Sequence, residues 1–308
     1  MKTYWNISKN LQPLTEWQPN CWIQVTAPSA TEVRSLEEDY GLPGDFVTDI
    51  ADVDERARCD SEDGWTLVIL RIPFAKEMAS RTPFTTIPLG ILFKDDVIMT
   101  ICHNECDVVK DFISFHQKRG EGFIDVVDMT FRLFLTSSVW YLKHLKQIGS
   151  RINQAKRALD DDINNESLVA LSRLQDSLTY FMTSIRGNEN LLQKLRFKLP
   201  VDELDIDLIE DVGIEVTQAR EIAGIYSDIL ESTMDTYSNV INNNMNKTMR
   251  TLTAFSIVMM FPTIVGTIYG MNLINGLETN PYGMPIALGI SVVASAAAWL
   301  VLKYKKLI

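Results

Sequence analysis

Residues 251–272 read TLTAFSIVMMFPTIVGTIYGMN, and none of them carries a charged side chain. A second apolar run, residues 286–302, reads IALGISVVASAAAWLVL. Each run is close to the roughly 20 residues with which a helix crosses about 30 Å of hydrocarbon at 1.5 Å per residue. We therefore predict membrane-spanning helices at 251–271 and 286–302, because the buried hairpin of a soluble protein rarely sustains two such runs side by side.

The charges on either side of these runs predict their orientation. The nearest basic residues are Lys247, Arg250, Lys303, Lys305 and Lys306, whereas the connecting residues 272–285 contain no Lys or Arg. Because Lys and Arg are enriched on the cytoplasmic side, both ends of the chain are expected in the cytoplasm. The prediction is a multi-pass protein of the cell inner (plasma) membrane, with an external loop at 272–285 and a basic tail at 303–308.

Composition excludes several classes of protein. The chain has 308 residues, of which 46% are hydrophobic, and a formal net charge of −11. Neutralising phosphates requires a basic face, so we expect no nucleic-acid partner.

Four irregularly spaced cysteines indicate reduced thiols rather than a disulfide framework. The segment Cys102–Cys106 contains one histidine but no second pair of ligands, so we expect buried structural cysteines rather than a zinc site.

Upstream of the membrane, residues 1–121 alternate strand and helix signals and predict a cytoplasmic α/β domain. Strands are expected at Trp22–Thr26, Trp65–Ile72, Ile87–Phe93 and Val97–Cys102, and helices at Thr31–Tyr40 and Glu105–Gln117. Lys94–Asp96 is expected to form a hairpin turn between the last two strands.

Residues 122–250 are expected to form a cytoplasmic stalk of long helices. A turn near Asp160–Asn164 precedes a second helix at Glu166–Phe197. The third helix begins near Asp202 and has no strong breaker before Pro262, so it would run on the order of 100 Å into the membrane. The predicted fold class is an α+β cytoplasmic domain with a long helical stalk and two C-terminal transmembrane helices.

Polar side chains follow one face of this third helix. Placed 100° apart, the following positions fall within about 100° of one another: Asp235, Asn242, Asn246, Met249, Thr253, Ser256, Met260, Thr263 and Thr267. Ser and Thr in a membrane helix often serve only packing. The stripe continues outside the membrane through Asn246 and Asn242, where packing between membrane helices does not require a row of asparagines. This continuation favours a path for cations. Two spans cannot enclose water, so the path requires several chains around an axis.

The first span ends in a short motif. Tyr269-Gly270-Met271-Asn272 closes an apolar helix and is followed by a short loop, a second span and a lysine-rich end. In this position the motif resembles that of the CorA family of magnesium channels, and the likeness extends from about Gly122 to Ile308. The resemblance implies a funnel-shaped homopentamer in membrane lipid, with the first span of every subunit lining a central pore.

The resemblance also implies roles for individual residues. Asn272 of each subunit would form a ring at the outer mouth and bind hydrated Mg²⁺, in a selectivity filter with Tyr269, Gly270 and Met271. The pore-lining positions of the family fall here on Asn246, Met249, Leu252, Met260 and Thr263, and the polar stripe adds Ser256 and Thr267. Neutral carbonyls suit the ring because Mg²⁺ surrenders its water reluctantly. Glu278 in the loop would attract cations, although a single exposed acid is more often only solvated.

An acidic run opens the long helix. Its members are Asp202, Glu203, Asp205, Asp207, Glu210 and Asp211. Acids at a helix N-terminus are stabilised by the helix dipole, and a solvated surface is one interpretation of this run. The resemblance implies a second one, in which internal Mg²⁺ binds between cytoplasmic domains and closes the pore. Asp211 matches one acidic position of that regulatory site; its partner is expected near Phe74–Glu77, where Lys76 departs from the pattern.

No phosphate-binding loop, dinucleotide fingerprint or nucleophile motif occurs in the sequence, so we predict neither an enzyme nor a cofactor. The membrane potential supplies about 2.3 kcal/mol per charge per 100 mV and suffices to draw a divalent cation inward. We expect Mg²⁺ as substrate and regulatory ligand, with Co²⁺ and Ni²⁺ as further candidates. Two alternatives remain open: a Zn²⁺ transporter of the same superfamily, which typically has isoleucine where Met271 stands, and a membrane-anchored sensor or scaffold that does not conduct.

Overall fold

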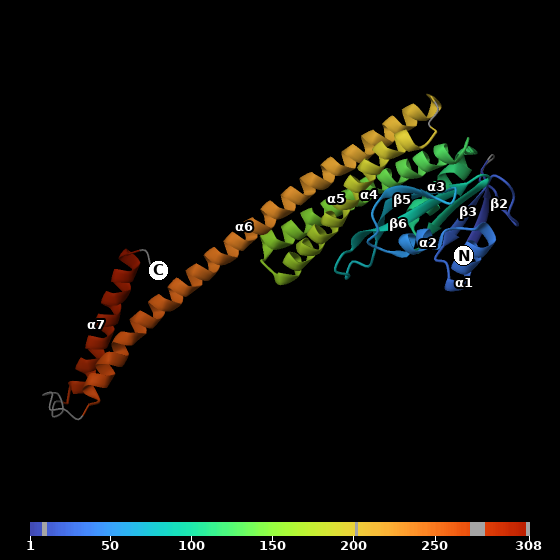
Figure 1. Ribbon diagram of the computed structural model, residues 1–308. Coiled ribbons are helices and arrows are strands. Elements are labelled where there is room, and N and C mark those ends of the chain that lie inside the picture. The colour runs from blue at the N-terminus through green and yellow to red at the C-terminus, as the bar shows by residue number, and fades with distance from the viewer. Residues whose placement is uncertain (8–10, 201–202, 272–280, 306–308) are drawn as a thin grey trace. The chain divides into compact units, whose positions relative to one another are not determined.

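The computed structural model describes residues 1–7, 11–200, 203–271 and 281–305 (Figure 1). The strands are β1 (Lys2–Asn6), β2 (Pro13–Leu14), β3 (Cys21–Thr26), β4 (Arg58–Glu62), β5 (Trp65–Ala75), β6 (Phe84–Lys94) and β7 (Val97–Cys102). The helices are α1 (Ala30–Tyr40), α2 (Gly44–Ala51), α3 (Asp107–Arg119), α4 (Val126–Asp161), α5 (Asn165–Lys198), α6 (Glu203–Tyr269) and α7 (Gly283–Tyr304). The chain divides into two compact units, Met1–Met234 and Asp235–Ile308.

The strands of the first unit form one mixed sheet in the order β2-β1-β3-β7-β6-β5-β4. β3 and β7 run parallel, and all other neighbouring pairs are antiparallel. Between β6 and β7 the chain turns at Asp95 and Asp96, and Asp95 has a φ of 48°, as expected for a tight hairpin turn. This confirms the predicted hairpin and the four predicted strands, which are β3, β5, β6 and β7.

Helices cover both faces of the sheet. On one face, Leu36 of α1 and Phe46 and Ile50 of α2 pack into a core with alternate residues of the central strands. Gly90 of β6 lies under α2, where a Cβ atom would be only 2.2 Å from Ile50 Cδ1. A side chain at Gly90 would therefore push α2 off the sheet.

On the opposite face, aromatic side chains join the sheet to α3, α4 and α5. The rings of Trp22 on β3 and Phe112 on α3 meet edge to face at 5.9 Å. The ring of Phe84 on β6 lies 5.4 Å from that of His144 on α4 and 6.4 Å from that of Phe181 on α5. Because both faces of the sheet are covered, the central strands are apolar almost throughout their length. These continuous apolar runs allowed the strands to be predicted from the sequence.

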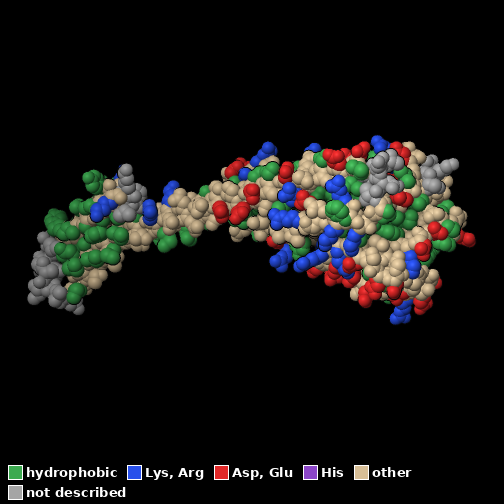
Figure 2. All heavy atoms as spheres, turned by 45° about the horizontal axis from the view of Figure 1, so that its top comes forward, with side chains coloured by type: hydrophobic (Ala, Val, Ile, Leu, Met, Phe, Trp, Pro, Cys, Tyr) green, Lys and Arg blue, Asp and Glu red, His purple; other side chains and the backbone are tan. Residues whose placement is uncertain are grey.

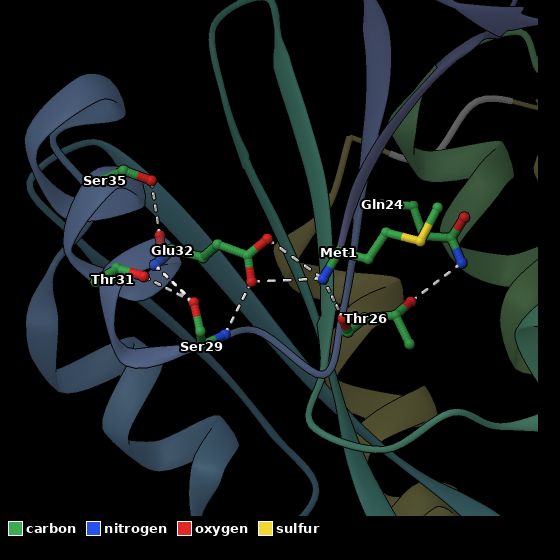
Figure 3. Close-up of polar contacts among 7 residues, drawn as sticks. All are labelled: Met1, Gln24, Thr26, Ser29, Thr31, Glu32 and Ser35. Carbon is green, nitrogen blue, oxygen red and sulfur yellow. Dashed lines mark hydrogen bonds and ion pairs between the residues drawn. The ribbon is translucent and has the colours of Figure 1, made fainter.

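Helix α1 begins with a reciprocal cap (Figure 3). Ser29 Oγ accepts a hydrogen bond from the amide of Glu32 at 3.3 Å, and the Glu32 carboxylate accepts one from the amide of Ser29 at 2.9 Å. The amino group of Met1 lies 3.4 Å from the same carboxylate and donates to the carbonyl oxygen of Thr26. Gly41 closes α1 in the left-handed conformation with a φ of 63°.

The long helices lie close to where they were predicted. α4 and α5 are separated by residues 162–164, and Asn164 caps α5 by accepting a hydrogen bond from the amide of Ser167. α6 has 67 residues and continues through Pro262 as one helix. The predicted turn near Asp160–Asn164 and the unbroken third helix are both confirmed.

Among the described residues, two helices are long and apolar enough to cross a membrane: α6, within Ile206–Tyr269, and α7. Only 6% of the most apolar stretch of each is buried. Figure 2 shows hydrophobic side chains crowded on the surface of the part that carries α7 and the end of α6. Exposed apolar residues there include Phe255, Ile264, Leu288, Val293 and Leu300. This surface is the one expected of helices that meet lipid or other membrane helices.

Candidate functional site

The predicted pore face of α6 is exposed in the single chain. Its members are Asn246, Met249, Leu252, Ser256, Met260, Thr263 and Thr267, and all of them are accessible. Leu252 is 64% exposed and Met260 55% exposed, high values for apolar side chains in a folded protein. The face is therefore free to meet water or other copies of the chain, and its assignment to a pore stays a prediction.

Three hydroxyl groups of this face donate to the backbone of their own helix. Ser256 Oγ donates to the carbonyl of Leu252 at 2.9 Å, Thr263 Oγ1 to that of Met259 at 3.1 Å, and Thr267 Oγ1 to that of Thr263 at 2.7 Å. A hydroxyl has one hydrogen and two lone pairs. With the hydrogen committed to the helix, each oxygen turns only acceptor lone pairs toward its surroundings.

The other side of α6 packs against α7. Pro262 lacks an N–H group, so the carbonyl of Val258, four residues earlier, loses its donor in the helix. Ser295 Oγ of α7 donates to this carbonyl at 3.3 Å. Next to this bond lies a hollow of about 530 Å³ between the two helices, lined among others by Pro262, Gly266 and Ser291.

The predicted selectivity filter begins where α6 ends at Tyr269. The amide of Gly270 donates to the carbonyl of Gly266 at 2.9 Å, which extends the helical bonding by one residue. A Cβ atom at Gly270 would lie 3.0 Å from that same carbonyl oxygen, so glycine suits this tight end. Met271 is 51% exposed, whereas Asn272 and Glu278 lie outside the described residues.

The candidate regulatory residue Asp211 lies on an exposed face of α6. Lys76 and Glu77, in the segment where its partner is expected, are exposed just beyond the end of β5. Within the described part of the chain, no three His, Cys, Asp or Glu side chains are grouped so as to hold a metal ion. The regulatory site at Asp211 therefore stays a prediction.

The cysteines predicted to be structural are free thiols, and all four are buried. Cys102 ends β7 and Cys106 precedes α3, and a hydrogen bond between their side chains raises the pKa of the Cys102 thiol. This arrangement agrees with buried structural cysteines.

A hollow that the sequence did not indicate lies between α5 and the start of α6. It has a volume of about 750 Å³ and is lined by apolar residues such as Leu192 and Ile209 together with the acids Glu189, Glu210 and Glu221. Glu210 belongs to the acidic run of the sequence, and Glu189 lies 3.3 Å from Arg220 Nε. One member of the acidic run, Glu210, therefore lines this hollow.

Comparison with known proteins identifies relatives over most of the chain. Residues 17–305 match the model of the family described as CorA-like Mg²⁺ transporter protein. The chain is 24% identical over 286 residues to the cobalt/magnesium transport protein CorA of Methanocaldococcus jannaschii, covering 88% of this chain and 86% of that protein.

Two solved structures share the fold. The complete structure of the CorA magnesium transporter from M. jannaschii matches with a TM-score of 0.82 and 21% identity, covering 98% of this chain and 97% of that one. The ZntB cytoplasmic domain from Vibrio parahaemolyticus matches with a TM-score of 0.62 and 16% identity, covering 78% of this chain and 98% of that one. At these identities the likeness establishes the fold alone. Since the family match spans nearly the whole sequence, the chain belongs to the CorA-like Mg²⁺ transporter family, a family of transporters rather than enzymes.

Proposed function

We propose that this chain is one subunit of a homo-oligomeric channel that carries Mg²⁺ through a pore lined by α6. The observation that carries the proposal is the row of acceptor-only hydroxyl oxygens at Ser256, Thr263 and Thr267, on an exposed face that leads to Gly270. The names of the relatives support the choice of ion, because they are cobalt/magnesium and magnesium transport proteins.

This lining suits a hydrated divalent cation. Mg²⁺ holds its water molecules tightly with their oxygen atoms inward, so the hydrogens of the hydration shell point outward and need acceptors. Neutral oxygen atoms supply these acceptors without the strong attraction of a carboxylate ring. Conduction requires that an ion enter readily and leave again, and weak, repeated sites meet both conditions.

The filter and the assembly are inferred from the family. Asn272 of each subunit forms the ring at the outer mouth in this proposal, and five subunits surround the axis, as the sequence resemblance implies. Because basic residues flank the two spans on the side of both chain ends, we expect both ends in the cytoplasm, with the membrane potential drawing cations inward. Asp211 contributes to an inhibitory Mg²⁺ site between subunits.

The proposal is tested by Mg²⁺ flux into liposomes that contain the purified chain, with an ion-sensitive dye inside. We expect uptake that increases with an inside-negative potential and is abolished in Asn272→Ala. Replacing external Mg²⁺ by Co²⁺, Ni²⁺ or Zn²⁺ in the same vesicles ranks the ions. Faster uptake of Zn²⁺ than of Mg²⁺ would assign the chain to zinc transport, and absence of all uptake would favour a scaffold.

The regulatory part of the proposal has a separate test. Asp211→Ala is expected to weaken the inhibition of flux by Mg²⁺ loaded inside the vesicles while leaving uptake at low internal Mg²⁺ unchanged. Asp228→Ala, an acid farther along α6, serves as the matched control. Equal inhibition in all three proteins would remove Asp211 from the regulatory site.

A further inference from the structure

The hydrogen bond between Ser295 and Val258 replaces one that a proline removes. In an α-helix the carbonyl of Val258 would accept from the amide of residue 262, and Pro262 has none. The hydroxyl of Ser295 reaches across from α7 and donates to this carbonyl at 3.3 Å. In an apolar membrane an unpaired backbone carbonyl is costly. α7 therefore supplies the hydrogen bond that the Val258 carbonyl of α6 loses to Pro262.

The position of this bond relative to the polar stripe is informative. At 100° per residue, Val258 lies about 170° and Pro262 about 150° from the middle of the stripe. α7 is therefore attached to the side of α6 that faces away from Thr263 and Thr267. Thr263 immediately follows Pro262, so any change of helix direction at the proline moves the hydroxyls beyond it and Gly270 with them.

We propose that Ser295 is a positioning residue for conduction: by donating to the Val258 carbonyl, it fixes the direction that α6 takes after Pro262. The inference rests on the proposed function, because it assumes that the stripe of α6 lines the pore. Ser295 itself lies on α7 and, in this proposal, touches neither the ion nor the filter.

Ser291 provides a matched control on the same helix. It lines the same hollow, and its hydroxyl donates to the carbonyl of Ala287 in its own helix at 3.1 Å. Ser291→Ala and Ser295→Ala thus remove the same atom one helical turn apart, but only the second leaves the carbonyl of Val258 without a donor. Ser295→Thr retains a hydroxyl at the same position.

The test is the initial rate of Mg²⁺ uptake into liposomes, normalised to the amount of assembled protein. We expect Ser295→Ala to change the rate about fivefold or more, whereas Ser291→Ala and Ser295→Thr stay close to wild type. A decrease would mean that the conducting state makes the bond, and an increase that the closed state makes it.

A second background separates this mechanism from a general packing defect. Pro262→Ala restores an amide that can donate to the Val258 carbonyl within α6. Adding Ser295→Ala to it should therefore change the rate no further. Equal effects of Ser295→Ala in both backgrounds, or equal rates for Ser295→Ala and Ser291→Ala, would overturn the inference. Absence of uptake by the wild type would instead refute the proposed function.

Discussion

Asn188 of α5 occupies the place of a missing strand beside Arg71 of β5. The amide of Arg71 donates to Asn188 Oδ1 at 3.0 Å, and Asn188 Nδ2 donates to the carbonyl of Arg71 at 2.7 Å. The last residue of β5 that pairs with β4 is Ile69, so Arg71 lies beyond that strand's end. One side-chain amide thereby satisfies both backbone groups of a buried residue and joins the sheet to the helices.

Replacing Asn188 by alanine should destabilise the first unit. The buried amide of Arg71 would lose its acceptor, while the carbonyl would keep the hydrogen bond from the Tyr141 hydroxyl at 3.0 Å. We expect the free energy of unfolding to fall by about 2 kcal/mol, measured as a lower midpoint of thermal unfolding. Asn190→Ala is the control, because Asn190 is exposed on the same helix. A similar loss in both variants would contradict the prediction.

Protonation of His116 should make stability depend on pH. His116 is only 2% exposed and packs against the rings of Phe112 and Phe123. Burial lowers the pKa of this imidazole from 6.5 to about 4. The unfolded chain binds the proton more readily than the folded chain does. The neutral His116 imidazole therefore contributes its full stabilisation of the folded state above pH 6.5, and this contribution is lost as the pH falls toward 4.

The loss over this interval should reach about 3 kcal/mol, at 1.36 kcal/mol for each pH unit. It is measured by comparing unfolding between pH 7 and pH 4 for wild type and His116→Phe, in which nothing titrates at this position. We expect a shallower pH dependence in the variant. If both proteins lose stability in parallel, His116 is not the group responsible.

Gly149 of α4 should tolerate no side chain. A Cβ atom there would lie 2.5 Å from the ring and hydroxyl atoms of Tyr226 on α6. We expect Gly149→Ala to lower the thermal midpoint, with a cost of about 1 to 3 kcal/mol, because the helices must separate or the ring must move. Gly224→Ala, where no atom lies within 4 Å, should instead be neutral or stabilising by up to about 1 kcal/mol. Tyr226→Ala should relieve the defect of Gly149→Ala.

The oxygen of Thr263 should matter for conduction, whereas an equivalent oxygen on another side of α6 should not. Thr263→Val keeps the shape of the side chain but removes the acceptor, and we expect Mg²⁺ uptake to fall on the order of fivefold. Thr251→Val is the control, since Thr251 also donates to its own helix, at 3.0 Å to the carbonyl of Lys247, but points away from the stripe. Equal effects of the two substitutions would argue against a pore-lining role.

Hydrophobic periodicity in the sequence predicted those strands and helices whose own residues carry the spacing typical of the element. β5, β6 and β7 are apolar because both faces of the sheet are covered, and α4 to α7 have the apolar spacing of helices. β1, β2, β4 and α2 were not predicted. β4 reads Arg-Cys-Asp-Ser-Glu and lies at the edge of the sheet, where pairing with β5 rather than an apolar run makes it a strand.

In the candidate site, the polar stripe of α6 was predictable from the sequence, whereas its contact with α7 was not. The stripe from Asn246 to Thr267 follows from helical spacing alone, and all its members lie on one exposed face. The role of Ser295 could not be predicted, because it depends on which side of α7 meets α6. The signal was nevertheless present: Pro262 removes a donor inside an apolar helix, and a polar side chain had to replace it.

The hydroxyl groups along α6 have one more consequence. Proton hopping along a file of water requires wall groups that can donate and accept in turn, and Ser256, Thr263 and Thr267 have their hydrogens committed to backbone carbonyls. In the proposed pore, such a wall would solvate a metal ion without relaying H⁺ itself. If the chain conducts as proposed, metal ions would pass without dissipating, through these side chains, the proton gradient that drives ATP synthesis.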